Sequence, residues 1–288
     1  MRVGFLGPSG TFAEEALRSS APDGVEEVPF ATVWDTVMAV QERAVDQAVV
    51  PIENSLEGSV TTTLDALAGE ASDVRIVAEV VRPITHCLIA RDSVGLDDVT
   101  RVLSHPQALA QCARFLHERL PHVGTEVAGS TAEAVRTAVA SSEPLAAIGT
   151  RLAAELYGGA VLAEGVEDRP DNLTRFVWLA PAGTDPHGPA TKTSVVFWGF
   201  NDESPGALVA VLRELADRGV NLTKIESRPR RVQLGHYMFF ADLEGSEDED
   251  AVREALAGLR RRVETLRVLG SYPAAPTPQP PRPAGPPG

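Results

Sequence analysis

The segment from Asn172 to Phe176 combines a hydroxyl, a permanent positive charge and an aromatic ring directly before an apolar run. The hydroxyl of Thr174 can donate a hydrogen bond to a leaving oxygen. The guanidinium of Arg175 can hold a carboxylate through two parallel hydrogen bonds. The ring of Phe176 can shield a ring-shaped ligand from water. Side by side, these residue types indicate a site for a small anionic molecule.

Two further polar segments follow predicted strands. Glu53, Asn54 and Ser55 come directly after an apolar strand-like run, and Ser104 precedes a predicted helix that carries Gln111. In α/β folds, ligand clefts open at the carboxyl ends of strands. A polar surface loop and a simple helix cap explain these residues about as well, so the residues alone leave both interpretations open.

A glycine turn at residues 7–11 joins the first predicted strand to the first predicted helix. Backbone amides and the helix dipole at such a turn can face an anion. The spacing is neither a dinucleotide-binding fingerprint nor a Walker loop. A tight structural turn is an equally good interpretation.

Composition narrows the classes of function. The chain has 288 residues, a formal net charge of −14 and a pI near 4.9, which argues against general affinity for nucleic acid. An anionic ligand then needs a local positive pocket. The two cysteines, Cys87 and Cys112, are too few for a disulfide framework, which favours a reduced, cytoplasmic setting. The sequence predicts no membrane helix, signal peptide, metal site or cofactor.

Residues 1 to about 180 alternate β-branched runs with amphipathic helical stretches, which is typical of an α/β fold with a largely parallel sheet. Strands are predicted at residues 3–6, 47–52, 76–90, 101–103, 123–127 and 145–148. Helices are predicted at residues 12–18, 32–44, 61–68, 107–120, 131–140 and 151–157. The long extended run 76–90 interrupts the alternation, as a crossover between two lobes would.

The last third of the chain predicts a second domain. Residues 181–191 contain three prolines and two glycines, the composition of an interdomain linker, so we expect a boundary near residue 185. Elements in the order βαββαβ then predict a ferredoxin-like unit at residues 192–269, with its first helix beginning at Ser204 and Pro205. The final 18 residues contain eight prolines, so residues 270–288 are expected to form a disordered tail.

The chain resembles the prephenate dehydratase family as far as about residue 268. The resemblance rests on three segments: Val50-Pro51-Ile52-Glu53-Asn54-Ser55, Ser104-His105-Pro106-Gln107 and Asn172-Leu173-Thr174-Arg175-Phe176. It implies a two-lobed, periplasmic-binding-protein-like catalytic domain at residues 1–181. It also implies that prephenate loses carbon dioxide and its ring hydroxyl to give phenylpyruvate in L-phenylalanine biosynthesis, without metal or cofactor.

The resemblance implies roles for individual residues. Thr174 would donate a hydrogen bond to the leaving oxygen, Phe176 would form an apolar wall, and Arg175 would bind a substrate carboxylate or organise the site. A Glu53 carboxylate close to a dianion would be protonated or turned away. The expected set is catalytic Thr174, Glu53, Asn54 and Gln111, with substrate-binding Thr11, Ser55, Ser104, Arg175 and Phe176.

Residues 192–269 resemble the ACT domain, a regulatory domain found in this family. Gly206 would let an amino acid approach the start of a helix, where a carboxylate meets free amides. The expected phenylalanine-binding residues are Gly206, Ala207, Leu208, Asn221, Leu222, Glu226, Ser227, Arg228 and Pro229. ACT sheets commonly pair, so we expect a homodimer or homotetramer. A purely structural βαββαβ unit is the alternative.

Two other functions remain open at this level. An arogenate dehydratase acts on a substrate with an amino group in place of the keto oxygen, and no residue here decides between the two substrates. A noncatalytic amino-acid sensor would use the same two-lobed fold for binding only, because fold does not determine function. The first predicted strand begins almost at residue 1, so no fused chorismate mutase domain is expected.

Overall fold

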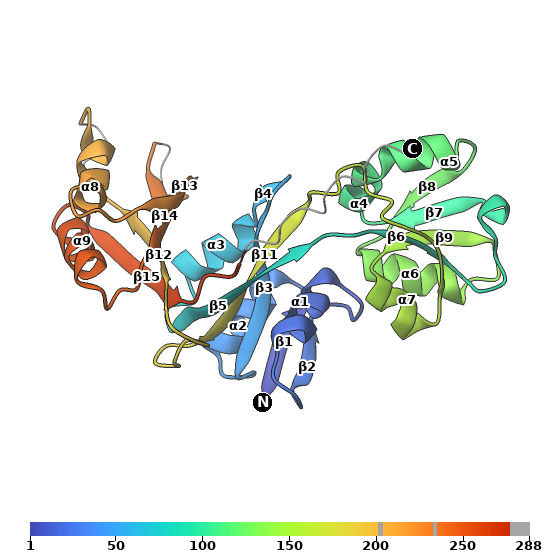
Figure 1. The fold of residues 1–288 in the computed structure, drawn as a ribbon, viewed down its shortest axis with the longest axis horizontal. Helices are drawn as coiled ribbons and strands as arrows, with labels where there is room; N and C mark the ends of the chain where they lie inside the picture. Colours follow the sequence, from blue (N-terminus) through green and yellow to red (C-terminus); the bar gives the residue numbers. More distant parts are fainter. Residues whose placement is uncertain (201–203, 233–234, 277–288) are drawn as a thin grey trace, which may run out of the picture.

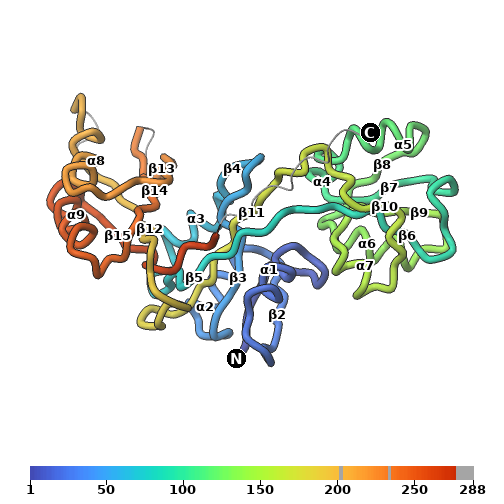
Figure 2. The backbone as a smooth tube through the Cα atoms, in the orientation of Figure 1, coloured from blue at the N-terminus to red at the C-terminus, as the bar shows by residue number. Residues whose placement is uncertain are grey.

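A computed structural model describes residues 1–200, 204–232 and 235–276. Three sheets follow one another along the long axis of an elongated molecule: a six-stranded sheet in the centre, a five-stranded sheet at one end and a four-stranded sheet at the other (Figures 1 and 2). We call them the first lobe, the second lobe and the ACT unit. The predicted fold class, α/β lobes followed by a ferredoxin-like unit, is confirmed.

The first lobe is built on the strand order β2-β1-β3-β11-β5, with β4 beside β3. Its strands are β1 (Arg2–Leu6), β2 (Glu26–Phe30), β3 (Gln47–Asn54), β4 (Gly58–Ser59), β5 (Val74–Pro83) and β11 (Leu173–Pro181). Its helices are α1 (Phe12–Ser20), α2 (Val33–Gln41) and α3 (Thr61–Ala68). Strand β11 returns from far along the chain and pairs antiparallel with both β3 and β5, so the sheet is mixed rather than largely parallel.

The second lobe has the strand order β10-β6-β9-β7-β8. Its strands are β6 (Cys87–Ala90), β7 (Arg101–Ser104), β8 (Gly124–Val127), β9 (Leu145–Gly149) and β10 (Ala160–Glu164), and a short 3-10 helix covers Leu96–Asp98. Its α-helices are α4 (Pro106–Gln111), α5 (Ala113–Arg119), α6 (Thr131–Ala140) and α7 (Arg151–Tyr157). Ser130 and Thr150 accept backbone N–H groups at the starts of α6 and α7, which is why these helices begin where the sequence predicts.

The two lobes are joined by the segment between β5 and β6 and by the segment before β11 (Figure 1). The single extended run predicted at residues 76–90 is two strands that belong to different sheets, separated by Ile84, Thr85 and His86. The predicted helix 107–120 is likewise two helices that meet at Cys112. The thiols of both cysteines are buried, and burial raises the pKa of Cys87 to about 11.

The ACT unit has the predicted element order. Its elements are β12 (Lys192–Trp198), α8 (Ala207–Ala216), β13 (Leu222–Pro229), β14 (Tyr237–Glu244), α9 (Asp250–Arg260) and β15 (Thr265–Tyr272), in the sheet order β13-β14-β12-β15. Helix α8 begins at Ala207, later than the expected Ser204 and Pro205, because Gly206 has a φ of 85° and is not helical. Strand β15 continues to the buried Tyr272, three residues beyond the predicted end at 269.

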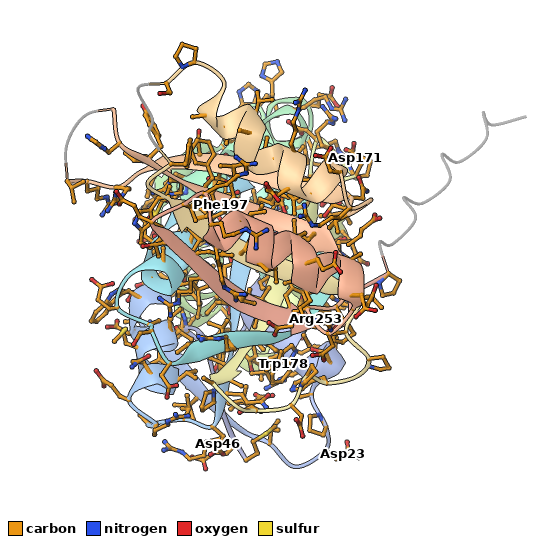
Figure 3. All side chains as sticks on the ribbon, turned by 90° about the vertical axis from the view of Figure 1, so that its left-hand side faces the viewer. Asp23, Asp46, Asp171, Trp178, Phe197 and Arg253 are labelled. Carbon is orange, nitrogen blue, oxygen red and sulfur yellow. The ribbon has the colours of Figure 1, made fainter. Side chains whose placement is uncertain are left out.

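One face of the ACT sheet packs against the first lobe, and helices α8 and α9 cover its other face (Figures 1 and 3). Val196, Phe240 and Leu269 share a buried apolar cluster with residues of α2, α3 and β11. Strand β15 lies so close to β5 that a Cβ atom on Gly270 would stand 2.1 Å from the carbonyl oxygen of Ile76. The sheet therefore packs directly against the first lobe.

The rest of the expected tail, residues 277–288, lies outside the described residues, so its predicted disorder stays a prediction. Residues 274 and 275 still donate backbone hydrogen bonds, to Thr191 and Glu79. Within the described ranges, no helix is both long enough and apolar enough to cross a bilayer.

The close contact at Gly270 makes a stability prediction. Gly270→Ala should lower the free energy of unfolding by about 1–3 kcal/mol, because β15 and β5 must move apart to admit a methyl group. Gly124→Ala is the matched control, since a Cβ atom there meets nothing within 4 Å. Urea denaturation of both variants measures the difference. Equal stability of the two variants would contradict the close packing.

Candidate active site

Strand β11 places neighbouring residues of one motif on opposite faces of the first lobe. Side chains alternate along a strand, and directly opposed residues on paired strands share a face. Thr174 lies opposite Asn54 of β3 and opposite Arg82 of β5. Phe176 belongs to the buried cluster on the α1 side, whereas Val177 belongs to the cluster shared with the ACT sheet. Thr174 therefore faces the α1 side, away from the ACT unit.

A chain of polar side chains crosses from the first lobe to the second. The Oδ1 atom of Asn54 accepts the backbone N–H groups of Leu56 and Glu57 at 2.9 and 3.0 Å. Its Nδ2 atom donates to Thr174 Oγ1 and to Asn172 Oδ1, both at 2.8 Å. Asn172 Nδ2 then donates to Oε1 of Gln111, on α4 of the second lobe, at 3.3 Å. The backbone amides fix the orientation of each amide along this chain.

The Thr174 hydroxyl is arranged as a donor. Its oxygen accepts a hydrogen bond from Asn54, and no other hydrogen bond of this hydroxyl occurs within residues 1–200, 204–232 and 235–276. The hydroxyl proton is therefore available to an oxygen from outside the protein. Only 7% of Thr174 is exposed to solvent, so a ligand oxygen at this position would be largely shielded from water.

Ser55 joins the same group of residues. Its hydroxyl accepts the backbone N–H of Leu173 at 2.9 Å and lies 3.5 Å from Asn172 Oδ1. Its own backbone N–H donates to the Leu173 carbonyl at 2.8 Å. The structure thus brings together four of the predicted residues: Thr174, Asn54, Ser55 and Gln111.

Arg175 lies on the other face of the sheet, within a cluster of buried charges. Its guanidinium contacts Asp242 of the ACT unit at 2.7 Å, Glu79 of β5 at 3.1 Å and Glu53 at 3.1 Å. Burial by itself would lower the pKa of Arg175, but these carboxylates raise that pKa, so the guanidinium stays charged. The Glu79 side chain is 1% exposed and is also held by Lys192 at 2.6 Å.

Glu53 is turned away from Thr174, as one of the two expectations for this carboxylate has it. It pairs with Arg175 and, at 3.3 Å, with Lys224 of the ACT unit. The predicted roles of Glu53 in catalysis and of Arg175 as a carboxylate ligand stay predictions. The geometry places both residues at the interface with the ACT unit, which fits the organising role expected for Arg175.

Three other predicted residues lie outside the polar chain. Thr11 caps α1 and donates its hydroxyl proton to the Leu6 carbonyl at 2.7 Å. Ser104 is fully buried in the second lobe and donates to the Ile148 carbonyl at 2.7 Å. Phe176 is 2% exposed and packs in the core of the first lobe. Their direct contacts with a ligand stay predictions.

The sequence interpretation left three residues of this region without a role. Asn172 stands at the centre of the polar chain, and the position of an asparagine two residues before Thr174 was the only signal for it. Glu57 lies 3.4 Å from Gln111 Nε2. Arg82 lies opposite Thr174, and its Nε atom is buried without a hydrogen-bond partner in the described part of the chain.

Among the residues described, the Arg82 guanidinium takes part in no ion pair or hydrogen bond. The nearby carboxylate of Glu15 has a pKa that burial raises, while the charge of Arg82 acts in the lowering direction. An available cation on the same face as Thr174 is what an anionic ligand requires in an acidic protein.

The expected phenylalanine-binding residues lie in two parts of the ACT unit. Gly206, Ala207 and Leu208 line a cavity of about 400 Å³ on the helical side of the sheet. Arg228, by contrast, forms a two-pronged ion pair with Asp65 of α3, at 2.8 and 2.9 Å. The remaining members of the set, all on or beside β13, are Asn221, Leu222, Glu226, Ser227 and Pro229.

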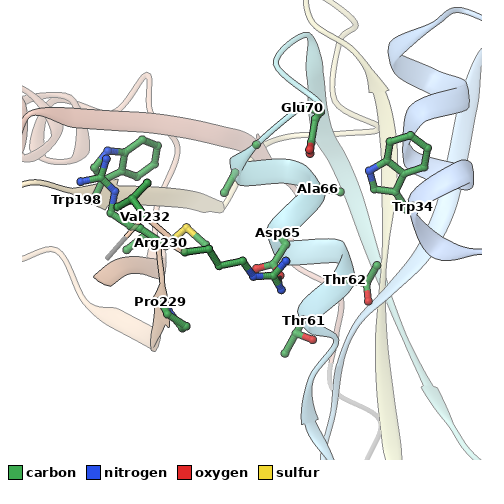
Figure 4. Close-up of a pocket in the computed structure, with 14 residues that line it drawn as sticks. Trp34, Thr61, Thr62, Asp65, Ala66, Glu70, Trp198, Pro229, Arg230 and Val232 are labelled. Atoms are coloured by element: carbon green, nitrogen blue, oxygen red, sulfur yellow. Dashed lines mark hydrogen bonds and ion pairs between the residues drawn. The ribbon is translucent and has the colours of Figure 1, made fainter. Parts of the chain in front are cut away.

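A groove of about 570 Å³ separates α3 from the ACT sheet. Figure 4 shows Asp65 of α3 on one side of it and Trp198 and Pro229 of the ACT unit on the other, with Trp34 beyond α3. This groove lies beside the Arg228 ion pair rather than beside Thr174, so it belongs to the contact between the two domains.

Comparison with known proteins covers both parts of the chain. The family model for prephenate dehydratase matches residues 3–184, and the model for the ACT domain matches residues 196–261. The bifunctional chorismate mutase/prephenate dehydratase of Aquifex aeolicus is 41% identical over 276 residues, which cover 96% of this chain and 74% of that protein. The prephenate dehydratase of Mycobacterium tuberculosis is 39% identical over 286 residues, covering 96% and 88%.

Two solved structures match nearly the whole chain. Prephenate dehydratase from Arthrobacter aurescens in complex with L-Phe has 41% sequence identity and a TM-score of 0.86, covering 94% of this chain and 90% of that chain. GqqA, described as a novel type of quorum-quenching acylase, has 33% identity and a TM-score of 0.84, covering 96% and 99%. The same fold is thus reported with two different activities.

The charge cluster makes a prediction for stability. Arg175→Met should lower the free energy of unfolding by about 3–5 kcal/mol, because Glu79 and Asp242 would keep buried charges with a cation removed. Arg253→Met is the control, since Arg253 is 58% exposed and pairs only at the surface with Asp250; it should change stability by less than about 0.5 kcal/mol. Urea denaturation compares the two. Similar small losses would mean that Arg175 is not the central cation of the cluster.

Proposed function

This chain belongs to the prephenate dehydratase family, and we propose that it converts prephenate to phenylpyruvate, carbon dioxide and water in L-phenylalanine biosynthesis, in the cytoplasm. The observation that carries the proposal is the Thr174 hydroxyl, which accepts from Asn54 and keeps its proton for an external oxygen. We assign catalytic roles to Thr174, Asn54, Gln111 and Glu53. Glu53 lies on the opposite face of the sheet from Thr174, where it pairs with Arg175.

The reaction requires little acid–base catalysis from the protein. As the ring carboxylate leaves as carbon dioxide, the electron pair of its C–C bond enters the ring, and the C–O bond at the opposite end of the ring breaks. The departing oxygen leaves as hydroxide and becomes water by taking a proton. A threonine is a poor acid, but its hydrogen bond strengthens as charge develops on that oxygen, an effect of about 3 kcal/mol.

Asn54 makes Thr174 a better donor. An N–H group that points at the threonine oxygen occupies one lone pair and directs the O–H bond outward, so little reorganisation is needed when the substrate arrives. The same amide is held by two backbone N–H groups of the β3–β4 turn. The donor is therefore oriented by the backbone of the first lobe.

Prephenate carries two carboxylates, and the site offers cations and N–H groups for them. We assign one carboxylate to Arg82, which lies opposite Thr174. The Gln111 amide, the α1 start at Thr11, Ser55 and Ser104 are the remaining polar candidates. Arg175, held by three carboxylates of the protein, organises the strand rather than the substrate.

Two rival functions are tested by the same assay. Arogenate differs from prephenate by an amino group at the side chain, and the polar set described here fits either substrate. A noncatalytic sensor would bind without turnover. The acylase activity printed for GqqA concerns that protein, and its likeness to this chain shows only that the fold accommodates more than one chemistry.

We also propose that L-phenylalanine binds the ACT unit and lowers activity. Support comes from the L-Phe complex of the Arthrobacter aurescens relative and from the cavity lined by Gly206, Ala207 and Leu208. An oligomer, a dimer or tetramer, follows from the same unit: β13 is an edge strand, and Ile225 on it is 43% exposed. Ile225 and its neighbours would then be covered by a second copy.

The first test of function is turnover. The purified chain should form phenylpyruvate from prephenate, Thr174→Ala should cut kcat by roughly 10²- to 10⁴-fold, and Thr174→Ser, which keeps a hydroxyl, should lose much less. Calorimetric binding of phenylalanine serves as the folding control, since the ACT unit lies on the other face. Near-normal turnover by Thr174→Ala would remove Thr174 from this role.

The outcome with wild-type protein separates the rivals. Turnover of prephenate that phenylalanine suppresses supports both domain assignments. Turnover of arogenate alone moves the assignment to arogenate dehydratase. Phenylalanine binding without turnover of either compound favours the sensor.

Arg82 makes a second prediction. Arg82→Met should raise the KM for prephenate by roughly 10- to 100-fold, because a charge-assisted hydrogen bond to a carboxylate is lost, and Arg82→Lys should fall in between. Arg101→Met is the control, as Arg101 has an exposed side chain at the start of β7 and pairs with Glu126 and Glu143. Steady-state kinetics at constant ionic strength gives the comparison. An unchanged KM for Arg82→Met would refute the assignment.

A further inference from the structure

His86 is a buried histidine at the joint between the two lobes. It lies between β5 and β6 and is 2% exposed. Its backbone N–H donates to the Glu167 carboxylate at 2.7 Å, and its carbonyl accepts from Val166 at 3.1 Å. Its ring meets the edge of Phe12, at the start of α1, with centroids 5.3 Å apart. The residue therefore touches both lobes at once.

The ring of His86 ends the polar chain that begins at Thr174. Its Nε2 atom lies 3.1 Å from Oε1 of Gln111, and its Nδ1 atom is buried with no partner in the described part of the chain. The structure adds a polar contact to a residue of the candidate site.

The donor and acceptor directions of the hydrogen bonds along this chain determine which nitrogen of the His86 ring carries the proton. Because Asn54 Oδ1 accepts backbone N–H groups, its Nδ2 must be the donor to Asn172 Oδ1. Asn172 Nδ2 is then the donor to Gln111, so the atom facing both Asn172 and His86 is the Gln111 oxygen. An oxygen there requires a donor on His86, which places the proton on Nε2.

We propose that His86 is a positioning residue for the reaction: its neutral ring donates from Nε2 to Gln111 and so keeps the Gln111 N–H groups directed toward an anionic substrate oxygen. In the structure Gln111 Nε2 lies 3.4 Å from Glu57 Oε1, so this amide already faces a carboxylate, which the substrate would replace. Without the donor at Nε2, the Gln111 side chain can turn and present its oxygen to the anion. This inference deepens the proposed function and rests on it.

The surroundings keep the ring neutral. Protonation would place a second N–H, on Nδ1, where the described residues offer no acceptor. Burial lowers the pKa of His86, while its contact with Gln111 and the charge of Glu167 act in the raising direction. Phe12 contributes no charge, and Glu57 lies beyond Gln111. The imidazole is thus held as a fixed donor and not as an acid.

The experiment compares two substitutions in kinetics. His86→Gln keeps an N–H donor near the position of Nε2 and should stay within about threefold of wild-type kcat/KM. His86→Leu removes the donor and should lower kcat/KM roughly 5- to 20-fold, mainly through KM. A loss of equal size in both variants would overturn the proposal, because the hydrogen bond would then not be the cause.

A double substitution separates positioning from simple packing. In a Gln111→Ala background, His86→Leu should cause no further loss of kcat/KM, since the group that it positions is already absent. A loss that persists in that background would assign His86 to packing alone. Phenylalanine binding to each variant confirms that the chain is folded.

Nitrogen NMR of the full-length protein tests the protonation state of the His86 ring directly, with no need for turnover. The His86 signals, identified by their disappearance in His86→Gln, should show a protonated Nε2 and a bare Nδ1 from pH 7 to 8. Protonation at Nδ1, or titration within this range, would overturn the proposal. If wild-type protein does not turn over prephenate, the proposed function fails, whereas this measurement still decides the state of the ring.

Discussion

The pairing register of strand β11 is the constraint on which the site depends. Thr174 and Arg175 are neighbours in sequence, so a strand must send them to opposite faces. Between β3 and β11 the register shifts by one residue: Phe176 lies opposite Pro51, while Arg175 lies opposite Glu53. Ile52 is the extra residue, as in a β-bulge, and it stays in the cluster shared with the ACT sheet. The bulge leaves Asn54 beside Thr174 and Glu53 beside Arg175.

Without that extra residue, each side chain of the Glu53–Asn54 pair would point to the other face. Asn54 would then face the ACT unit, and a carboxylate would stand beside the Thr174 hydroxyl. A carboxylate would take the hydroxyl proton as a hydrogen-bond acceptor, leaving none for a departing oxygen. A single irregularity in the ladder therefore decides whether Thr174 is a donor to the ligand or to the protein.

The sequence predicted the helices whose ends are set by local signals. It did not predict the strands that form only because a segment elsewhere in the chain pairs with them. Helices at 61–68, 131–140 and 151–157 have the predicted ends, because caps and apolar periodicity are local. Strand β2, with two glutamates and a proline, and strand β10 were not predicted, since each is an edge strand held by its neighbour. The grouping of Thr174, Asn54, Ser55 and Gln111 came from the family resemblance. Asn172 and His86 gained roles only when the structure showed both lobes together.

Arg175 illustrates the same limit and shows how regulation can reach the site. In the sequence, a guanidinium next to the Thr174 hydroxyl indicates a substrate ligand, but its principal partner in the structure is Asp242, 67 residues away in the chain. An effector changes activity only to the extent that it binds two arrangements of the protein with different affinity. The ACT unit touches this strand through Asp242 and Lys224, which hold Arg175 and Glu53.

Arg175 is the immediate neighbour of Thr174 in β11, and Glu53 is the immediate neighbour of Asn54 in β3. Buried ion pairs tolerate little separation, because each unpaired charge costs several kcal/mol. A small movement of β14 must then be followed by Arg175, or its buried ion pair with Asp242 breaks. The strands that carry Arg175 and Glu53 also carry the donor and its amide partner. The opposite faces of two strands thus join the effector domain to the chemistry without any contact between the effector and the substrate.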